Sequence, residues 1–294
     1  MITRVTQTMM MRSAQQNLQA SAARLAATQD KASSLRAITR PSDDPTGTAD
    51  ALRTRAEQRA VDQYTRNTDN GIGWLTAADS ALSTATNVLR RARDLTVQGA
   101  NDGALSDTAK ESLALELESL RDDLLGIANT SYLGRNVFAG NSDAGVAFAA
   151  DYSFTGTVGS TVQRRVAADQ TVRVDADGAA AFGEGAASVF QLLDDIATDL
   201  RSGVNVKARL GQIDDRATAI VGAQAEVGQR QAQVERAKET LVAQTGTLET
   251  RRASIEDVDL GQMALDLKMQ ELAYQSAIAV SAKVLPATLM DYLR

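Results

Sequence analysis

Apolar residues recur every seven positions along the last third of the chain. The column has no gap and no proline interrupts it; its members are Ile213, Ile220, Val227, Val234, Leu241, Leu248 and Ile255. This spacing keeps the apolar side chains on one face of an α-helix, which would be roughly 63 Å long. The positions three residues later are small or polar, so the pattern favours a mixed helical bundle over a free two-stranded coiled coil.

The first helix that the pattern predicts covers residues 1–39, which contain almost no helix breakers. Met11, Leu18, Leu25 and Ala32 form a column with the same seven-residue spacing. A stripe this thin buries little apolar surface, and a helix that carries it needs a partner. We therefore expect this segment to pack against another helix.

The stretch R-P-S-D-D-P-T-G at 40–47 ends that helix and begins the next. Pro41 disfavours the helical conformation of the residue before it. Pro45 suits the first position of a new helix, where its missing N–H costs nothing. Asp44 then lies at the N-cap, where its carboxylate accepts hydrogen bonds from free backbone N–H groups and is favoured by the helix dipole.

Two more helices follow this break. One is predicted from about Pro45 to Asn70, and Gly71 and Gly73 indicate a joint after it. The other carries apolar residues at spacings of three and four over 75–96. That spacing is typical of helices packed in a bundle.

A further helix is predicted before residue 140. Thr108 and Glu111 match a capping box at its start. Its apolar stripe consists of Leu113, Leu117, Leu120, Leu124 and Ile127.

The helical pattern is lost between 141 and 187, where glycine is frequent. Short alternating runs at 152–154, 171–174 and 181–183 indicate strands, and D-G at 177–178 is a hairpin signal. We read this segment as a small β-rich insertion. Helical spacing then resumes at Val189.

The chain ends in another amphipathic helix, whose apolar column is Val258, Leu265, Leu272 and Ala279. The predicted fold is therefore mainly α: a long antiparallel coiled-coil-like helical bundle rod with a small β-rich inserted domain. The chain leaves through helices and returns through a long helix, so both termini are expected at the same end.

Composition excludes several kinds of chemistry. The 294 residues include no Cys and no His, which removes Cys nucleophiles, His bases, disulfides and thiolate or imidazole metal sites. The net charge of -6 gives a nucleic-acid role no electrostatic support. The first residues lack the apolar core of a cleaved signal peptide, and no stretch approaches the ~20 apolar residues that span a membrane.

Each candidate site has a simpler structural interpretation. Asp43 and Asp44 are expected to form a turn and a cap rather than a carboxylate pair for a metal. D-A-D-G at 175–178 resembles the start of a calcium loop, but Ala186 stands where the loop needs a bidentate acid. Arg90 and Arg91 make no phosphate-binding stripe. N-T-S at 129–131 is a formal glycosylation acceptor. We expect no enzyme activity, no cofactor and no metal.

Three stretches resemble flagellar hook-associated protein 3, the hook–filament junction family within the bacterial flagellins. They are A-I-T-R-P-S-D-D-P-T-G at 37–47, I-A-N-T-S-Y-L-G-R-N-V-F-A-G at 127–140, and S-I-E-D-V-D-L at 254–260 together with the closing L-M-D-Y-L. N-T-D-N-G-I-G-W-L, from residue 67, looks like the same family. One feature, V-L-P-A-T-L-M near the end, is instead similar to flagellin itself.

The resemblance implies a structural role. It implies export by the flagellar type III apparatus without a cleaved signal, a ring of copies outside the cell, and contacts with hook-associated protein 1 and flagellin. An export chaperone is implied as a further partner. Flagellin and a non-flagellar coiled-coil scaffold stay open as alternatives.

On this basis we expect residues 1–40 and 256–294 to pair as assembly helices, 41–140 and 188–255 to form the bundle body, and 141–187 to form the outer domain. The assembly interface is expected to contain Met11, Leu18, Leu25, Leu35, Val258, Leu265, Leu272, Ile278, Leu285 and Leu289. The hinge and cap are Pro41, Asp44 and Pro45. The bundle core is expected to contain Leu82, Leu89, Leu117, Leu124, Val227, Val234, Leu241 and Leu248.

Overall fold

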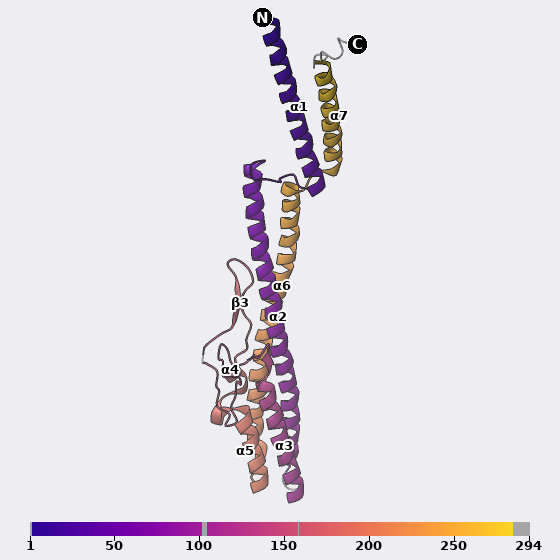
Figure 1. Ribbon diagram of the computed structural model, residues 1–294. Helices are drawn as coiled ribbons and strands as arrows, with labels where there is room; N and C mark the ends of the chain where they lie inside the picture. Colours follow the sequence, from indigo (N-terminus) through magenta and orange to yellow (C-terminus); the bar gives the residue numbers. More distant parts are fainter. Residues whose placement is uncertain (1, 102–104, 158, 285–294) are drawn as a thin grey trace. The chain divides into compact units, whose positions relative to one another are not determined.

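The computed structural model describes residues 2–101, 105–157 and 159–284 (Figure 1). The helices are α1 (Ile2–Ser34), α2 (Pro45–Gly99), α3 (Asp107–Ala128), α4 (Gly178–Phe182), α5 (Val189–Ser202), α6 (Arg209–Glu256) and α7 (Leu260–Val284). Four short strands and two 3-10 turns lie between α3 and α6: β1 (Ser131–Tyr132), β2 (Arg135–Asn136), β3 (Gln163–Arg165), β4 (Thr171–Arg173), η2 (Gly185–Ala187) and η3 (Val206–Ala208). The prediction of a mainly α fold with long helices is confirmed.

The chain divides into two compact units. Unit 1 contains Met1–Arg59 and Thr245–Arg294, and unit 2 contains Ala60–Gln244. Both α2 and α6 pass from one unit to the other. These boundaries differ from those that the sequence pattern suggested, at 40/41 and 255/256. The reason is that the first turns of α2 and the last turns of α6 have their contacts in unit 1.

The joint expected at Gly71 and Gly73 is wrong, because α2 runs unbroken through both. These glycines allow close packing instead. A Cβ on Gly73 would lie 2.1 Å from Oη of Tyr132, and one on Gly71 would lie 3.2 Å from Cγ1 of Val174. Glycine here makes room for neighbours at the side of the helix.

Two predicted helix ends move by a few residues. Helix α1 ends at Ser34 rather than near residue 39, because Leu35 adopts the left-handed conformation with φ 57°. Helix α3 is capped by Ser106, whose side chain accepts a hydrogen bond from the backbone N–H of Ala109, so the predicted pair Thr108 and Glu111 lies inside the helix. Ser, like Thr, is a favoured N-cap, and the capping-box pattern pointed to the wrong one of the two.

Unit 2 has one continuous hydrophobic core. It joins the inner faces of α2, α3, α5 and α6 with the segment between β1 and α5. The largest fully buried side chains are Trp74, Phe138, Phe148, Phe182, Phe190, Leu75, Leu82, Leu89, Leu117, Leu124, Leu193 and Ile196. Ion pairs line its edge, such as Arg93 with Asp214 and Lys238 with Asp69, which join α2 to α6.

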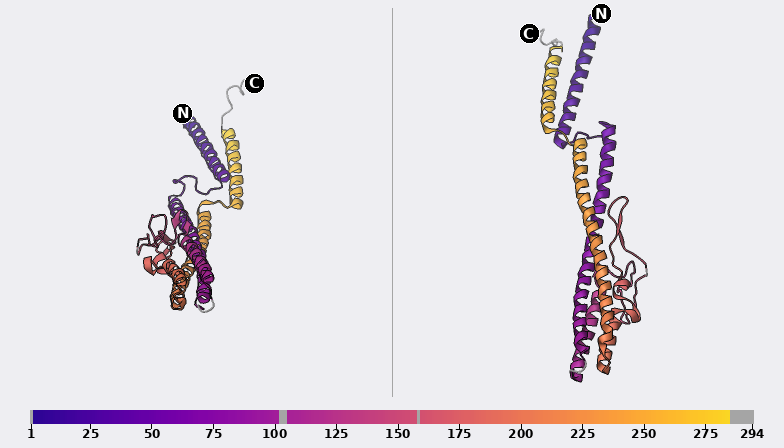
Figure 2. Two further views of the ribbon diagram at one scale, coloured as in Figure 1. Left: turned by 90° about the horizontal axis from the view of Figure 1, so that it is seen from below. Right: turned by 180° about the vertical axis from the view of Figure 1, so that it is seen from behind.

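The segment between α3 and α5 lies along one side of the helices of unit 2 (Figures 1 and 2). It contains two antiparallel hairpins, β1–β2 and β3–β4, together with the short helix α4 and the turn η2. The hairpin expected at Asp177–Gly178 is wrong: Asp177 caps α4, and its side chain accepts from the N–H of Ala180. All five phenylalanines of the chain lie in this segment or at the start of α5, and ring contacts such as Phe138–Phe182 at 5.2 Å join them.

Candidate functional site

The terminal helices α1 and α7 and the break before α2 are the candidate site for assembly. The break is built from two aspartates with separate tasks. The carboxylate of Asp43 turns back and accepts from Oγ1 of Thr39 at 2.9 Å and from the N–H of Arg40 at 3.0 Å. Asp44 lies at the N-cap of α2, where Oδ1 accepts from the N–H of Gly47 at 2.9 Å. Pro45 is the first residue of the helix.

The hydrogen bonds to Asp43 have an electrostatic consequence. The hydroxyl of Thr39 and the N–H of Arg40 both donate to its carboxylate, and they hold the pKa of Asp43 below its ordinary value. Asp43 is therefore charged at neutral pH and closes a local turn. Each aspartate therefore binds a backbone N–H group, Asp43 in the turn and Asp44 at the start of α2, which explains why they stand between the two prolines.

Helix α1 packs against α7 in an antiparallel pair (Figure 1). Over residues 9–34 the half-buried positions of α1 lie along one face. Seven of them follow a regular heptad, Met11, Ala14, Leu18, Ser21, Leu25, Thr28 and Ala32, and Ala22 and Lys31 lie beside it. Met11, Leu18 and Leu25 therefore lie on the packed face of α1, where the sequence placed them. Only small or polar side chains separate them, so the interface between the two helices is thin.

On α7 the expected apolar column faces away from α1. Leu265 is 63% exposed and Leu272 is 64% exposed, whereas Met263, Leu267 and Tyr274 are half-buried. The difference arises because α7 is apolar on more than one face, and a heptad count cannot tell which face meets α1. A helix that is apolar all round is stable only when other surfaces cover it.

The remaining predicted assembly residues divide as follows. Leu35 and Ile278 are exposed, and Val258 is half-buried. Leu285 and Leu289 lie outside the described residues. Pro41 is exposed in the turn before Asp44.

The predicted core residues lie where the sequence placed them, with one exception. Leu82, Leu89, Leu117, Leu124, Val227, Val234 and Leu241 are all buried. Leu248 is half-buried instead. It belongs to the part of α6 in unit 1. Among the described residues of that unit, no large apolar side chain is buried.

Several acidic side chains form ion pairs between the helices of unit 2. Asp194 of α5 pairs with Arg121 of α3 and accepts from the hydroxyl of Tyr152 at 2.6 Å. Burial and then this hydrogen bond to the carboxylate raise the pKa of Tyr152 to about 12. Arg201 of α5 contacts both Glu111 and Glu118 of α3. The sequence analysis missed these contacts, because charged residues on helix faces look alike whether they are solvated or paired.

Two other candidates also have structural roles. Asn129 of the formal glycosylation triplet uses its whole amide group: Oδ1 accepts from the N–H groups of Ala147 and Phe148 at 2.7 and 2.9 Å, and Nδ2 donates to the carbonyl of Phe148 at 3.0 Å. Arg91, considered for phosphate binding, pairs with Glu116. Both residues therefore hold neighbouring elements together.

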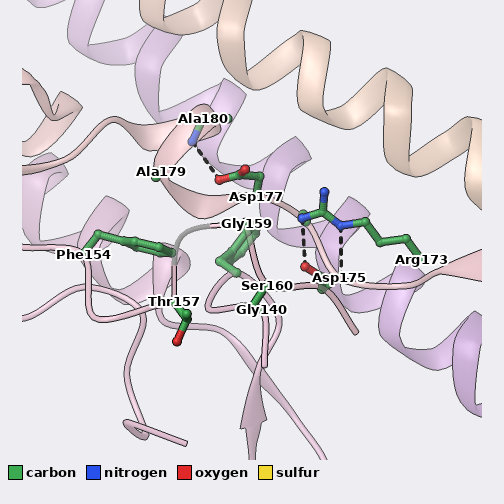
Figure 3. Close-up of a pocket in the computed structure, with 12 residues that line it drawn as sticks. Gly140, Phe154, Thr157, Gly159, Ser160, Arg173, Asp175, Asp177, Ala179 and Ala180 are labelled. Atoms are coloured by element: carbon green, nitrogen blue, oxygen red, sulfur yellow. Dashed lines mark hydrogen bonds and ion pairs between the residues drawn. The ribbon is translucent and has the colours of Figure 1, made fainter. Parts of the chain in front are cut away.

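A small cavity of about 110 Å³ lies beside α4 (Figure 3). Its charged side chains are already engaged within the protein. Asp175 accepts from both Nε and Nη2 of Arg173, at 3.1 and 2.9 Å, and Asp177 caps α4. The resemblance to a calcium loop at 175–178 therefore reflects a buried ion pair and a helix cap. Among the described residues no group of three or more acidic side chains gathers to hold a metal ion.

In the described part of the chain, none of the helices combines the length and the apolar character that crossing a membrane requires. The bacterial flagellin N-terminal helical region matches residues 5–143, and the bacterial flagellin C-terminal helical region matches residues 210–293.

Individual relatives give the same picture. A 30.7 kDa flagellar filament core protein of Treponema maltophilum is 26% identical over 260 residues, which cover 86% of each chain. A chain from Vibrio parahaemolyticus described as a flagellar hook-associated protein has a similar fold, with a TM-score of 0.68, 23% identity, and coverage of 73% of this chain and 100% of that one. The flagellar junction protein FlgL of Legionella pneumophila has a TM-score of 0.58 at 16% identity, covering 71% and 100%.

The two flagellin regions match the segments that form the long helices, α1 to α3 and α6 to α7. They leave out the segment 144–209, where the hairpin β3–β4, α4 and α5 lie. The chain belongs to the bacterial flagellin family.

Proposed function

We propose that this chain is the adaptor at the junction between the flagellar hook and the filament. It forms a ring of copies that binds hook-associated protein 1 on one side and flagellin on the other. It acts as a structural part and not as an enzyme. The observation that carries the proposal is the fold: solved hook-associated and junction proteins are covered along their whole length, and they match 73% and 71% of this chain.

The sequence supports the same choice within the family. R-P-S-D-D-P at 40–45 and G-R-N-V-F-A-G at 134–140 resemble hook-associated protein 3 more than flagellin. In the structure these stretches are the capped break before α2 and the strand β2 that leads into the phenylalanine cluster. Each therefore fixes local geometry, which explains why its residue types matter.

The terminal helices carry the assembly. Helix α7 presents a second apolar face away from α1, on which the side chains of Leu265, Met269 and Leu272 are exposed. Apolar patches of this kind mark contact surfaces. In the ring, this face packs against neighbouring subunits, and before export a chaperone covers it. The protein then lies outside the cell, exported without a cleaved signal.

The alternative is that the chain is a flagellin. The Treponema relative, a filament core protein, matches most of both chains and favours it. A filament subunit occurs along the whole filament, whereas an adaptor is confined to one band. A non-flagellar scaffold explains the heptads but not two separate flagellin regions.

Immunogold electron microscopy of intact flagella separates these functions. The antibody is raised against residues 141–187, which include many exposed positions. A band of label where hook meets filament is the result we expect. Label along the filament would identify a flagellin, and flagella without label would overturn a flagellar role.

A further inference from the structure

Unit 1 has almost no buried side chains. Among those that the structure describes there, the buried ones are Ala51, Thr54 and Glu256. A compact unit normally rests on a cluster of apolar side chains. Here the most buried ionisable group in the unit is a carboxylate, only 5% of the residue being exposed. Buried carboxylates occur where they are paired, so the surroundings of Glu256 show what holds the unit together.

The carboxylate of Glu256 binds two helices. Oε2 accepts a hydrogen bond from Nη2 of Arg55 in α2 at 2.8 Å, and it lies 3.6 Å from Nη1 of Arg252, one turn earlier in α6. Arg36 adds a third positive charge from the segment after α1. Asp257, the next residue, has its own contact with Arg252 at 3.4 Å.

The backbone of the same residue binds the segment after α1. The carbonyl of Glu256 accepts from the N–H of Ala37 at 2.7 Å, and the N–H of Val258 donates to the carbonyl of Leu35 at 3.4 Å. Arg36 and Asp257 form an antiparallel bridge between these two contacts. Carbonyl groups at the end of a helix lack partners within the helix, so this short ladder satisfies the end of α6.

The segment that is held there is strained. Leu35 has φ 57°, a backbone conformation that residues other than Gly and Asn rarely adopt. Leu35 is also 53% exposed, so burial of its own side chain does not explain why it stays there. A strained backbone persists only where its surroundings hold it, and the ladder to α6 is what holds Leu35.

We propose that Glu256 is a latch: its carboxylate binds Arg55 of α2 while its backbone holds the segment after α1, so that loss of its charge releases this segment. Glu256 is the last residue of α6 and lies next to the connections that lead to α1 and α7, whose pairing is thin. The latch acts within unit 1 of one chain, and it stands whether the protein is an adaptor or a filament subunit.

The latch is sensitive to acid. Burial acts to raise the pKa of Glu256, but the hydrogen bond from Arg55 and the charges of Arg55, Arg252 and Arg36 outweigh it and leave the pKa below its ordinary value of 4.5. A group whose pKa is lowered by folding stabilises the folded form above its unfolded pKa. The stabilisation is lost as the pH falls through the lower, folded value. The latch is therefore closed at neutral pH and opens in strong acid.

Two spin labels test the latch in the monomeric full-length chain. Because the chain has no Cys, Ser34→Cys and Ser254→Cys introduce the only thiols, at exposed positions on either side of the ladder. We expect a narrow distance distribution at pH 7 and a broad one in Glu256→Gln. Amide exchange gives a second readout, and exchange at Ala37 should accelerate by on the order of tenfold when the charged hydrogen bond is lost.

The matched control is Glu57→Gln, which removes an exposed pair in the same unit, 3.9 Å from Arg251. It should leave the distance distribution narrow, because exposed pairs contribute little. Arg55→Gln should reproduce Glu256→Gln, and the double variant should add nothing more. Acid should broaden the distribution of the wild-type chain below pH 4.5 and leave that of Glu256→Gln unchanged.

Three results would overturn the latch. One is a Glu256→Gln distribution as narrow as that of Glu57→Gln. Another is exchange that accelerates equally at residues 213–241 of unit 2, because Glu256 would then support the whole fold rather than one segment. The third is Glu256→Gln broadening further in acid as the wild type does.

Discussion

Glycine has two different uses in the long helices. In α2 a Cβ on Gly71, Gly73 or Gly99 would lie 3.2 Å or closer to a side chain of a neighbouring element. In α6 a Cβ on Gly211, Gly222, Gly228 or Gly246 would meet nothing within 4 Å. The first group is required by packing, whereas the second lowers helix stability without a visible contact in the described chain.

This contrast predicts opposite effects of one substitution. Gly73→Ala should destabilise the protein by about 1–3 kcal/mol, because the new methyl group collides with the ring of Tyr132, which packs on Trp74. Gly228→Ala should stabilise it by up to ~1 kcal/mol, since alanine is the better helix former. Denaturant unfolding of both variants measures the difference. Equal shifts in the same direction would contradict the packing role of Gly73.

The tip of the hairpin β1–β2 is strained. Its two-residue loop is Leu133–Gly134, with φ values of 51° and 78°, and the side chain of Leu133 is among the most exposed large apolar groups, at 74%. Two-residue loops with two positive φ values favour Asn-Gly. Leucine therefore occupies a position that suits asparagine.

We predict that Leu133→Asn stabilises the protein by roughly 1 kcal/mol, because it relieves the left-handed strain. Little buried apolar surface is lost, since the side chain of Leu133 is exposed. Leu133→Val is the control. It keeps an apolar side chain but is β-branched, so it should destabilise the turn. Thermal melts of both variants measure the order of stability. If valine were tolerated as well as asparagine, the strain at this turn would be negligible.

At the scale of elements, the start of α2 depends on one side chain. Asp44→Ala removes the acceptor for the N–H of Gly47 and should destabilise the first turn by about 0.5–2 kcal/mol. Asp44→Asn is the matched control, because asparagine is an equally good N-cap. Amide exchange at residues 46–50 should rise in the alanine variant and stay close to wild type in the asparagine variant.

Periodicity predicted the elements well where one face of a helix is buried. The column Ile213 to Leu241 faces the core at every position, and Asp44 and Pro45 begin α2 at the expected residues. These features are local: a repeat of seven, a cap and a proline act on their own segment. The sequence alone was therefore enough to find them.

The errors came from contacts between distant residues. Gly71 and Gly73 looked like a joint because the close approach of Val174 and Tyr132 cannot be read from the helix itself. Leu265 looked like a packed residue because α7 has several apolar faces. Asp177 looked like a turn residue, although it caps a helix of five residues, too short to show a period.

At the scale of the whole molecule, two leucines separate folding from assembly. Leu241 is 2% exposed and Leu265 is 63% exposed. Leu241→Asp buries a charge and should destabilise the protein by more than about 3 kcal/mol. Leu265→Asp should change the stability of the monomer by less than about 0.5 kcal/mol. It should nevertheless block assembly, because its side chain lies on the outer face of α7.

Unfolding of the purified chains and recovery of the protein in sheared flagella measure the two effects. Loss of Leu265→Asp from flagella, with an unchanged unfolding midpoint, would support the division of labour. The division would be wrong if both variants melted like wild type and still assembled.

The last prediction concerns the order of α1 and α7 before assembly. The half-buried positions of α1 are largely Ala, Ser and Thr with single large residues, and those of α7 include Asp266, Gln270 and Glu271. The buried groups described in unit 1 lie elsewhere, at Ala51, Thr54 and Glu256. Two helices with so little buried surface are marginal in water. We therefore expect both to open readily in the free monomer and to become stable when neighbouring subunits cover the outer face of α7.

Amide exchange on the monomer and on the assembled protein measures this change. Residues 9–34 and 260–282 should exchange fast in the monomer and slow down on assembly, whereas the segment 213–241 should be protected in both states. Strong protection of both helices in the monomer would sink the idea, because the pair would then fold without neighbours. The exposed apolar face of α7 would in that case be a preformed docking surface rather than part of a segment that folds on assembly.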